Sequence, residues 1–195
     1  LVLTGIAAII LGMGMTTTAV YITVAALIVP SLIQMDVVPM AAHLFAFYFG
    51  VVSTITPPVA LASFAAAAIA GSKPMATAVE SARIGIAKYL VPFAFVYNPS
   101  LLFEGPGWLT VISTAFALVG MWGLSVMLEG WHKGRISMPV RTIVGLSSLA
   151  LLFPPQLDFF DTVPGYAVVT IGLACLVVVL TMQNRSRQTV NGRTG

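Results

Sequence analysis

Long apolar stretches dominate the first part of the chain, and each is interrupted near its middle by a short polar segment. One stretch covers residues 1–32 and is interrupted at 12–18 by Gly-Met-Gly-Met-Thr-Thr-Thr. The other covers residues 40–71 and is interrupted at 53–58 by Ser-Thr-Ile-Thr-Pro-Pro. Glycine raises the entropic cost of a helix and proline removes an amide donor, so both segments are predicted to break helices.

If these stretches enter a bilayer, the position of each break limits how the chain can cross it. At about 1.5 Å per residue, neither arm of the first stretch, 1–11 or 17–32, crosses a hydrocarbon core of roughly 30 Å. The first stretch is therefore predicted to be either one discontinuous helix or a re-entrant hairpin with its tip at the midplane. Freed backbone groups are tolerated there only where they are buried in protein or line a cavity. Two such breaks in succession are typical of the binding sites of secondary transporters.

The remaining apolar segments predict about four further transmembrane helices. A segment at the membrane interface is predicted to lead into a helix at residues 80–103, which Pro92 is predicted to kink. Residues 106–183 hold three additional spans, at 108–128, 141–154 and 164–182. Residues 30–39 are predicted to be a connector, and the polar tail 184–195 to be disordered. The predicted fold class is an all-α integral membrane protein.

Composition agrees with a membrane location. Of the 195 residues, 58% are hydrophobic and only 8% are charged, too few to cover the surface of a soluble protein. The net charge of +3 comes from residues in predicted loops, so we expect no nucleic-acid partner. The single Cys175 excludes an intrachain disulfide. Because the apolar pattern starts at Leu1 without a basic leader, we expect the chain to be the C-terminal portion of a longer polypeptide.

The basic residues predict an orientation. If the predicted helices cross the membrane in order, every lysine and arginine falls on one side, which the positive-inside rule makes the cytoplasm. The tail and the C-terminus are then cytoplasmic, and Glu104, Asp158 and Asp161 lie on the opposite side. The basic residues are Lys73, Arg83, Lys88, Lys133, Arg135, Arg141, Arg185, Arg187 and Arg193.

The two breaks carry the candidate binding residues. Neutral hydroxyl and carbonyl oxygens suit Na⁺, and the N-terminus of a half-helix suits a substrate carboxylate through its partial positive charge. The alternative is that the hydroxyls bond to their own helices and the glycines serve packing. The candidate substrate- and ion-binding residues are Gly12, Gly14, Thr16, Thr17, Thr18, Ser53, Thr54, Thr56 and Pro57. Among them, the candidate Na⁺ ligands are Gly12, Gly14, Thr17, Thr54 and Thr56.

Other kinds of chemistry lack the residues that they need. The sequence has no HExxH motif, no paired intramembrane aspartates and no phosphate-binding loop. We therefore expect neither an enzyme nor an ATP-driven pump, and no cofactor besides Na⁺ as the coupling ion. His43 could relay protons, but a hydrogen-bonded structural histidine is the expectation.

Several motifs resemble the large permease subunit of the TRAP (tripartite ATP-independent periplasmic) transporters. They are the glycine–threonine tip at 12–19, Ala-His-Leu-Phe at 42–45, Thr-Pro-Pro-Val-Ala at 56–60, Val-Pro-Phe at 91–93 and Asn-Pro at 98–99. The resemblance covers residues 1–105, although Thr16 stands where the family usually has proline. The additional spans after Trp108 resemble the extended C-terminus of the TAXI branch, in which the small and large membrane subunits are fused.

The resemblance implies a fold, a function and partners. Residues 1–35 would be an outward-opening re-entrant hairpin that faces a discontinuous helix at 40–71. Together they would form the C-terminal half of an inverted-repeat transport domain of the elevator type, holding one Na⁺ and part of the substrate site. The protein would import an organic acid, such as a dicarboxylate, with Na⁺ across the bacterial inner membrane.

The partners that the resemblance implies are a periplasmic substrate-binding protein, an N-terminal half and a small membrane subunit. The competing class is a structural or assembly membrane subunit that transports nothing, and a channel is the third option. In that class the breaks would serve packing alone.

Overall fold

A computed structural model describes residues 1–131, 136–153, 170 and 172–174. Every regular element in these ranges is a helix, in agreement with the predicted all-α class. The chain divides into two compact units, Leu1–Pro106 and Gly107–Gly195. Most of the predicted span 164–182 and the whole predicted disordered tail 184–195 lie outside the described residues.

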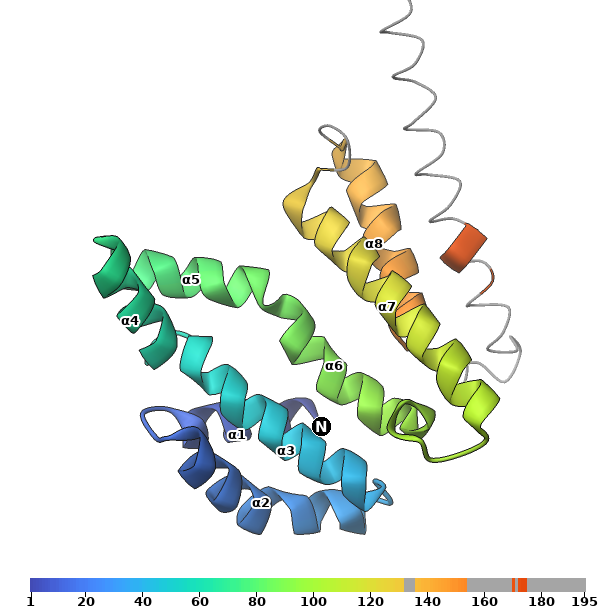
Figure 1. The fold of residues 1–195 in the computed structure, drawn as a ribbon, viewed down its shortest axis with the longest axis horizontal. Coiled ribbons are helices and arrows are strands. Elements are labelled where there is room, and N and C mark those ends of the chain that lie inside the picture. The colour runs from blue at the N-terminus through green and yellow to red at the C-terminus, as the bar shows by residue number, and fades with distance from the viewer. Residues whose placement is uncertain (132–135, 154–169, 171, 175–195) are drawn as a thin grey trace, which may run out of the picture. The chain divides into compact units, whose positions relative to one another are not determined.

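The first unit begins with a helical hairpin. The chain reverses after α1, and α2 runs back antiparallel beside it (Figure 1). α3 and α4, in contrast, continue in the same general direction with a break between them (Figure 1). The depth of the hairpin tip in a bilayer stays a prediction. The helices of this unit are α1 (Val2–Gly12), α2 (Thr17–Gln34), α3 (Pro39–Val52), η1 (Ser53–Ile55), α4 (Leu61–Ala70), α5 (Pro74–Ile84), α6 (Ile86–Tyr97) and η2 (Pro99–Leu102).

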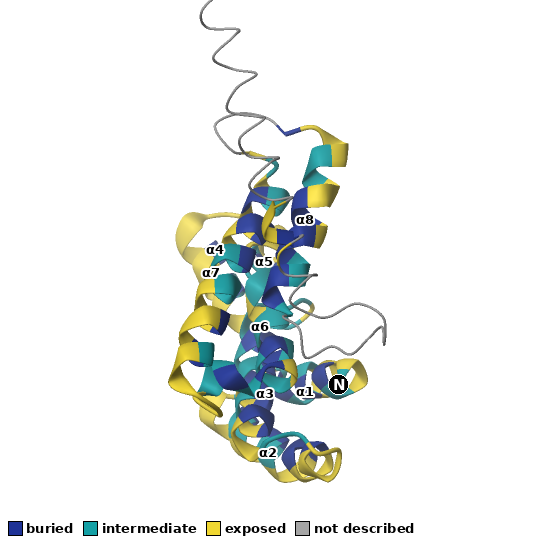
Figure 2. Ribbon diagram, turned by 90° about the vertical axis from the view of Figure 1, so that its right-hand side faces the viewer, coloured by how far each residue is buried: buried dark blue, intermediate teal, exposed yellow. Residues whose placement is uncertain are grey.

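Small residues let α1 lie close to α3. The buried face of α1 consists of Gly5, Ala8 and Gly12, at helical spacing. A Cβ placed on Gly5 would lie 3.0 Å from Cζ of Phe49, so the ring already fills that space. Close approach of this kind replaces large side-chain contacts in membrane helices. Figure 2 shows buried residues where α1, α2 and α3 meet. Phe45 of α3 is fully buried there.

Aromatic rings attach α6 to α3. The ring of Phe93 contacts Phe45 and Phe49 edge to face, with centroid distances of 5.4 and 5.6 Å. Such pairs are favourable beyond the apolar area that they bury. α6 is therefore fixed on the same core that holds the hairpin.

The predicted connector at 30–39 was wrong, because α2 continues through Pro30 to Gln34. Val29 and Leu32 are buried on either side of the proline, so packing against the core keeps this turn helical. The connector is limited to residues 35–38. At 18 residues, α2 is long and apolar enough to cross a membrane by length and composition alone, whereas neither arm of the hairpin was expected to cross.

The predicted single helix at 80–103 was also wrong. α5 ends at Ile84, Gly85 separates it from α6, and α6 ends at Tyr97. Pro92, the predicted kink, lies inside α6 without ending it. The end of α6 is explained by Pro99, because a residue before proline avoids the α conformation, and Asn98 has φ −136° and ψ 79°.

The second unit contains α7 (Gly107–Glu129) and α8 (Met138–Leu152), which pack on each other. α7 confirms the helix predicted at 108–128, and among the described helices it is the second that could cross a membrane by length and composition. A Cβ on Gly120 would lie 2.8 Å from the carbonyl oxygen of Ser148, so the two backbones are close. Arg141 donates from Nε and Nη2 to the carbonyls of Met127 and Leu128, at 2.8 and 3.0 Å. These carbonyls end α7, where a cation is favourable.

Candidate functional site

The first break lies between α1 and α2 at residues 13–16, within the predicted interruption 12–18, so Gly12 ends α1 and Thr17 and Thr18 begin α2. Gly14 has φ +80°, in the left-handed region that glycine adopts without steric cost. Thr16 is the N-cap of α2, and its Oγ1 accepts a hydrogen bond of 3.4 Å from the amide of Ala19. Threonine therefore starts this helix through a side-chain cap.

The second break lies between α3 and α4 and contains the predicted Ser53–Pro58 segment. After the single turn of η1, the backbone is irregular as far as Ala60. The hydroxyls of Thr54 and Thr56 donate to the carbonyls of Val51 and Val52, each at 2.7 Å. These two side chains therefore bond back to carbonyls three and four residues earlier, at the end of α3, in the local manner that the packing alternative expected.

A buried serine ties the two breaks together. Ser53 Oγ lies 3.0 Å from the carbonyl oxygen of Gly12 and 2.6 Å from that of Gly50, so its single hydrogen is shared between two acceptors. A Cβ on Gly12 would lie 2.6 Å from Ser53 Oγ and 2.9 Å from Ser53 Cβ. Because any side chain at residue 12 would displace the serine, glycine is needed for this contact.

The second break is also held from α6. Thr56 Oγ1 and the hydroxyl of Tyr89 lie 2.7 Å apart. A Cβ on Gly85 would lie 2.8 Å from Cδ1 of Ile55, which places the start of α6 directly against η1. The irregular segment thus contacts the hairpin on one side and α6 on another.

The structure brings together some of the predicted site residues and leaves others apart. Gly12 and Ser53 are in direct contact, and Thr54 and Thr56 lie within the same break. The side chains of Thr16, Thr17 and Thr18 are exposed, as is Gly14, and Pro57 is half-buried. No hydrogen bond in the described part of the chain joins these threonines to Ser53. The role of Thr17 as a Na⁺ ligand, and that of Thr16 and Thr18 as substrate- or ion-binding residues, stays a prediction.

The breaks nevertheless offer oxygens that a cation could use. A hydroxyl that donates its hydrogen keeps lone pairs, so Ser53, Thr54 and Thr56 can still act as acceptors. Pro58 has no amide hydrogen and cannot pair with the carbonyl of Thr54 four residues earlier. Unwound carbonyls of this kind coordinate Na⁺ in secondary transporters.

Two residues near the second break were not among the sequence candidates. Ser63, in the first turn of α4, is 2% exposed, and its Oγ has no hydrogen-bond partner. Its signal in the sequence was a lone hydroxyl in an alanine-rich helix directly after the break. Tyr89 gave no signal, because its contact with Thr56 spans 33 residues.

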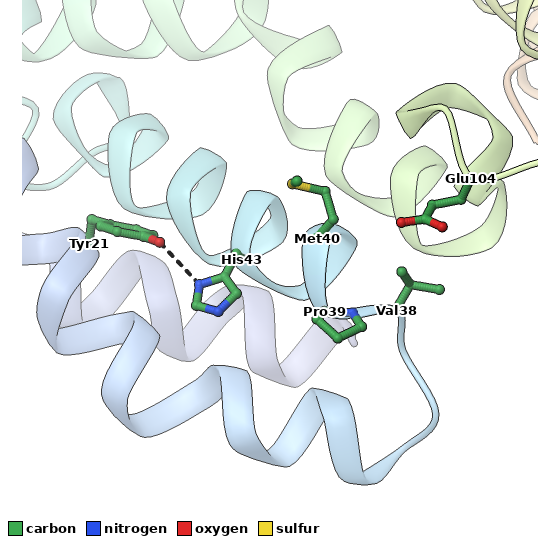
Figure 3. A pocket seen from close by; sticks show the side chains of 6 residues that line it. All are labelled: Tyr21, Val38, Pro39, Met40, His43 and Glu104. Atoms are coloured by element: carbon green, nitrogen blue, oxygen red, sulfur yellow. Dashed lines mark hydrogen bonds between the residues drawn. The ribbon is translucent and has the colours of Figure 1, made fainter.

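A separate pocket extends from the connector between α2 and α3 to Tyr21, near the start of α2. Figure 3 shows its lining side chains, with the hydroxyl of Tyr21 hydrogen-bonded to Nδ1 of His43 at 3.0 Å. This bond confirms the expectation that His43 has a hydrogen-bonded partner. The pocket has a volume of about 570 Å³ and is lined by Tyr21, Val38, Pro39, Met40, His43 and Glu104.

Comparison with known proteins decides the family. Residues 1–105 match the family described as "Tripartite ATP-independent periplasmic transporter, DctM component". The chain belongs to this family. The matched residues of this DctM component coincide, to within one residue, with the first compact unit, Leu1–Pro106. No curated protein and no solved structure matches the chain.

Membership fixes the general role of the DctM component. The family is one of transporters rather than enzymes, and its members are permease components in the inner membrane. The second unit, which contains α7 and α8, lies outside the matched range. The function of the family is therefore assigned to the unit that contains both breaks.

Proposed function

We propose that this DctM component imports an organic acid with Na⁺ as the coupling ion, and that its two breaks form part of the ion and substrate site. The observation that carries the proposal is the hydrogen bond from Ser53 to Gly12, which joins breaks 41 residues apart. Secondary transporters use discontinuous helices that meet in this way to bind ions and substrates.

The charge distribution around the breaks supports an anionic substrate. Asp36 is the only acidic residue before residue 73, and it lies in the connector at the far end of α2 from the tip. α2 and α4 both begin at the breaks, and the N-terminus of a helix carries a partial positive charge. The N-cap of α4 is Ala60, whose side chain accepts no hydrogen bond. The amide of Leu61 donates to the carbonyl of Val59, so the next first-turn amides, of Ala62 and Ser63, can bind a carboxylate.

The proposal includes partners. A periplasmic substrate-binding protein delivers the acid, and an inverted first half of the transport domain encloses the site from the other side. Support comes from the motif resemblance and from the tripartite, periplasmic description of the family. The second unit is proposed to belong to a TAXI-type extension with a fused small subunit. The lysine and arginine distribution supports a cytoplasmic C-terminus.

Uptake by the complete transporter in proteoliposomes tests the ion coupling. A panel of radioactive organic acids is presented on the substrate-binding protein, with an inward gradient of either Na⁺ or K⁺. Uptake is expected with Na⁺ and should vanish with K⁺. Equal uptake with both ions would reject Na⁺ as the coupling ion.

A structural or assembly subunit is the second candidate function. The back-bonded hydroxyls of Thr54 and Thr56 favour it, because such bonds satisfy side chains without a ligand. The close packing of Gly12 on Ser53 fits it as well. The two candidates differ in what loss of a hydroxyl at a break should do. An ion site predicts a shifted Na⁺ dependence at unchanged abundance, and a packing role predicts lower abundance at unchanged Na⁺ dependence.

A further inference from the structure

We propose that Tyr89 is a positioning residue for the Na⁺ site, because its hydroxyl holds Thr56 Oγ1 in the orientation in which that oxygen meets the ion. The inference rests on the proposed function, since it takes Thr56 as a Na⁺ ligand. Tyr89 itself touches neither ion nor substrate in this account. It acts through Thr56, at a distance of 2.7 Å between the two hydroxyl oxygens.

The hydrogen-bond pattern determines which hydroxyl donates. Thr56 Oγ1 carries one hydrogen, and it lies 2.7 Å from the carbonyl oxygen of Val52, which can only accept. The bond between Thr56 and Tyr89 must therefore use the hydrogen of Tyr89. Thr56 Oγ1 then donates once and accepts once, which leaves one lone pair in a fixed direction for a cation.

The ring of Tyr89 is itself held by packing. It lies half-buried against the core formed by α1, α2 and α3. Four residues later on α6, Phe93 contacts the rings of Phe45 and Phe49. Residues four apart share a helix face, so both rings point toward that core. The hydroxyl of Tyr89 is thus presented from a rigid element.

The start of α6 makes a second contact with the break, at Ile55, the residue just before Thr56. Gly85 lies against Ile55, and one turn later Tyr89 bonds to Thr56. The break has few regular backbone hydrogen bonds to define its shape. Contacts from a rigid neighbour therefore decide where its oxygens point, as second-layer hydrogen bonds do around other metal ligands.

Sodium binding to the complete purified transporter tests the inference. Tyr89→Phe removes one hydroxyl and keeps the ring. It is expected to raise the half-saturating Na⁺ concentration about 3- to 10-fold, the range for one net hydrogen bond, without changing the amount bound at saturation. Tyr48→Phe is the matched control, because the ring of Tyr48 contacts Phe47 and Phe95, and its hydroxyl has no hydrogen bond in the described residues. Its curve should match that of the unmodified protein.

A double substitution shows whether Tyr89 acts through Thr56. If it does, Tyr89→Phe has no further effect on a protein that already carries Thr56→Val. Further weakening in that background overturns the inference, as does a Tyr89→Phe curve that superimposes on the unmodified one. If the unmodified transporter shows no saturable binding of radioactive sodium, the proposed Na⁺ coupling fails, and the inference fails with it.

Discussion

In the first unit, residues 1–106, helices are interrupted and hydroxyl side chains join one segment to another, whereas in the second unit α7 and α8 run without a break. Two serines show the difference. Ser53 and Ser148 are both fully buried, and each donates a 2.6 Å hydrogen bond to a carbonyl three or four residues earlier in the chain. Only Ser53 also reaches a different segment, at Gly12. Small and hydroxyl residues therefore hold broken helices together in the first unit, whereas in the second unit they serve packing.

The largest expected effect comes from adding bulk at a close glycine in each unit. Gly12→Val would collide with the side chain of Ser53, and Gly120→Val with the backbone of Ser148. Each should lower the free energy of unfolding by about 3 kcal/mol, the cost of overpacking a filled site. Thermal unfolding of the purified transporter measures this cost. Uptake per folded molecule should fall only for Gly12→Val, and equal losses would erase the distinction between the units.

Arg141 should have the next largest effect, confined to stability. Arg141→Met removes the donors to the last carbonyls of α7, at Met127 and Leu128. The free energy of unfolding should fall by about 2 kcal/mol, as expected for hydrogen bonds from a charged donor. Thermal unfolding should show this loss, with an unchanged Na⁺ dependence of uptake. A shifted Na⁺ dependence would show that the second unit contributes to the ion site.

The two buried serines give the most closely matched pair. Ser53→Ala and Ser148→Ala each remove one buried hydroxyl and should each cost about 1 kcal/mol of stability. Ser53→Ala should also raise the half-saturating Na⁺ concentration, because the hairpin tip is no longer tied to the second break. Sodium titration of uptake compares them directly. Identical titration curves would mean that the contact with Gly12 has no functional role.

The sequence was sufficient to predict features that depend on local backbone chemistry. Glycine and proline marked both breaks, and the apolar run after Trp108 gave α7 to within one residue at each end. The errors occurred where packing overrides a local signal. Pro30 stays helical because buried neighbours hold the turn, and a glycine, Gly85, separates α5 from α6 while Pro92 does not.

The contacts that define the candidate site could not be predicted from the sequence. Ser53 was chosen for its oxygen, but its partner Gly12 lies 41 residues away. Tyr89 was missed because nothing in an apolar helix distinguishes a tyrosine that bonds to a threonine from one that only packs. Such pairs depend on how α1 and α6 lie against η1, which is set by packing throughout the unit.

The most direct test of the central claim is the Na⁺ dependence of uptake, per folded molecule, after one hydroxyl at a break is replaced by a methyl group. The substitution is Thr56→Val, with Thr17→Val for the other break and Thr114→Val, exposed on α7, as the control. If the breaks form the ion site, Thr56→Val and Thr17→Val each leave abundance unchanged and shift the Na⁺ titration to higher concentration, while Thr114→Val shifts nothing. If abundance and uptake instead fall together with an unchanged Na⁺ titration, the breaks serve packing alone and the claim is wrong.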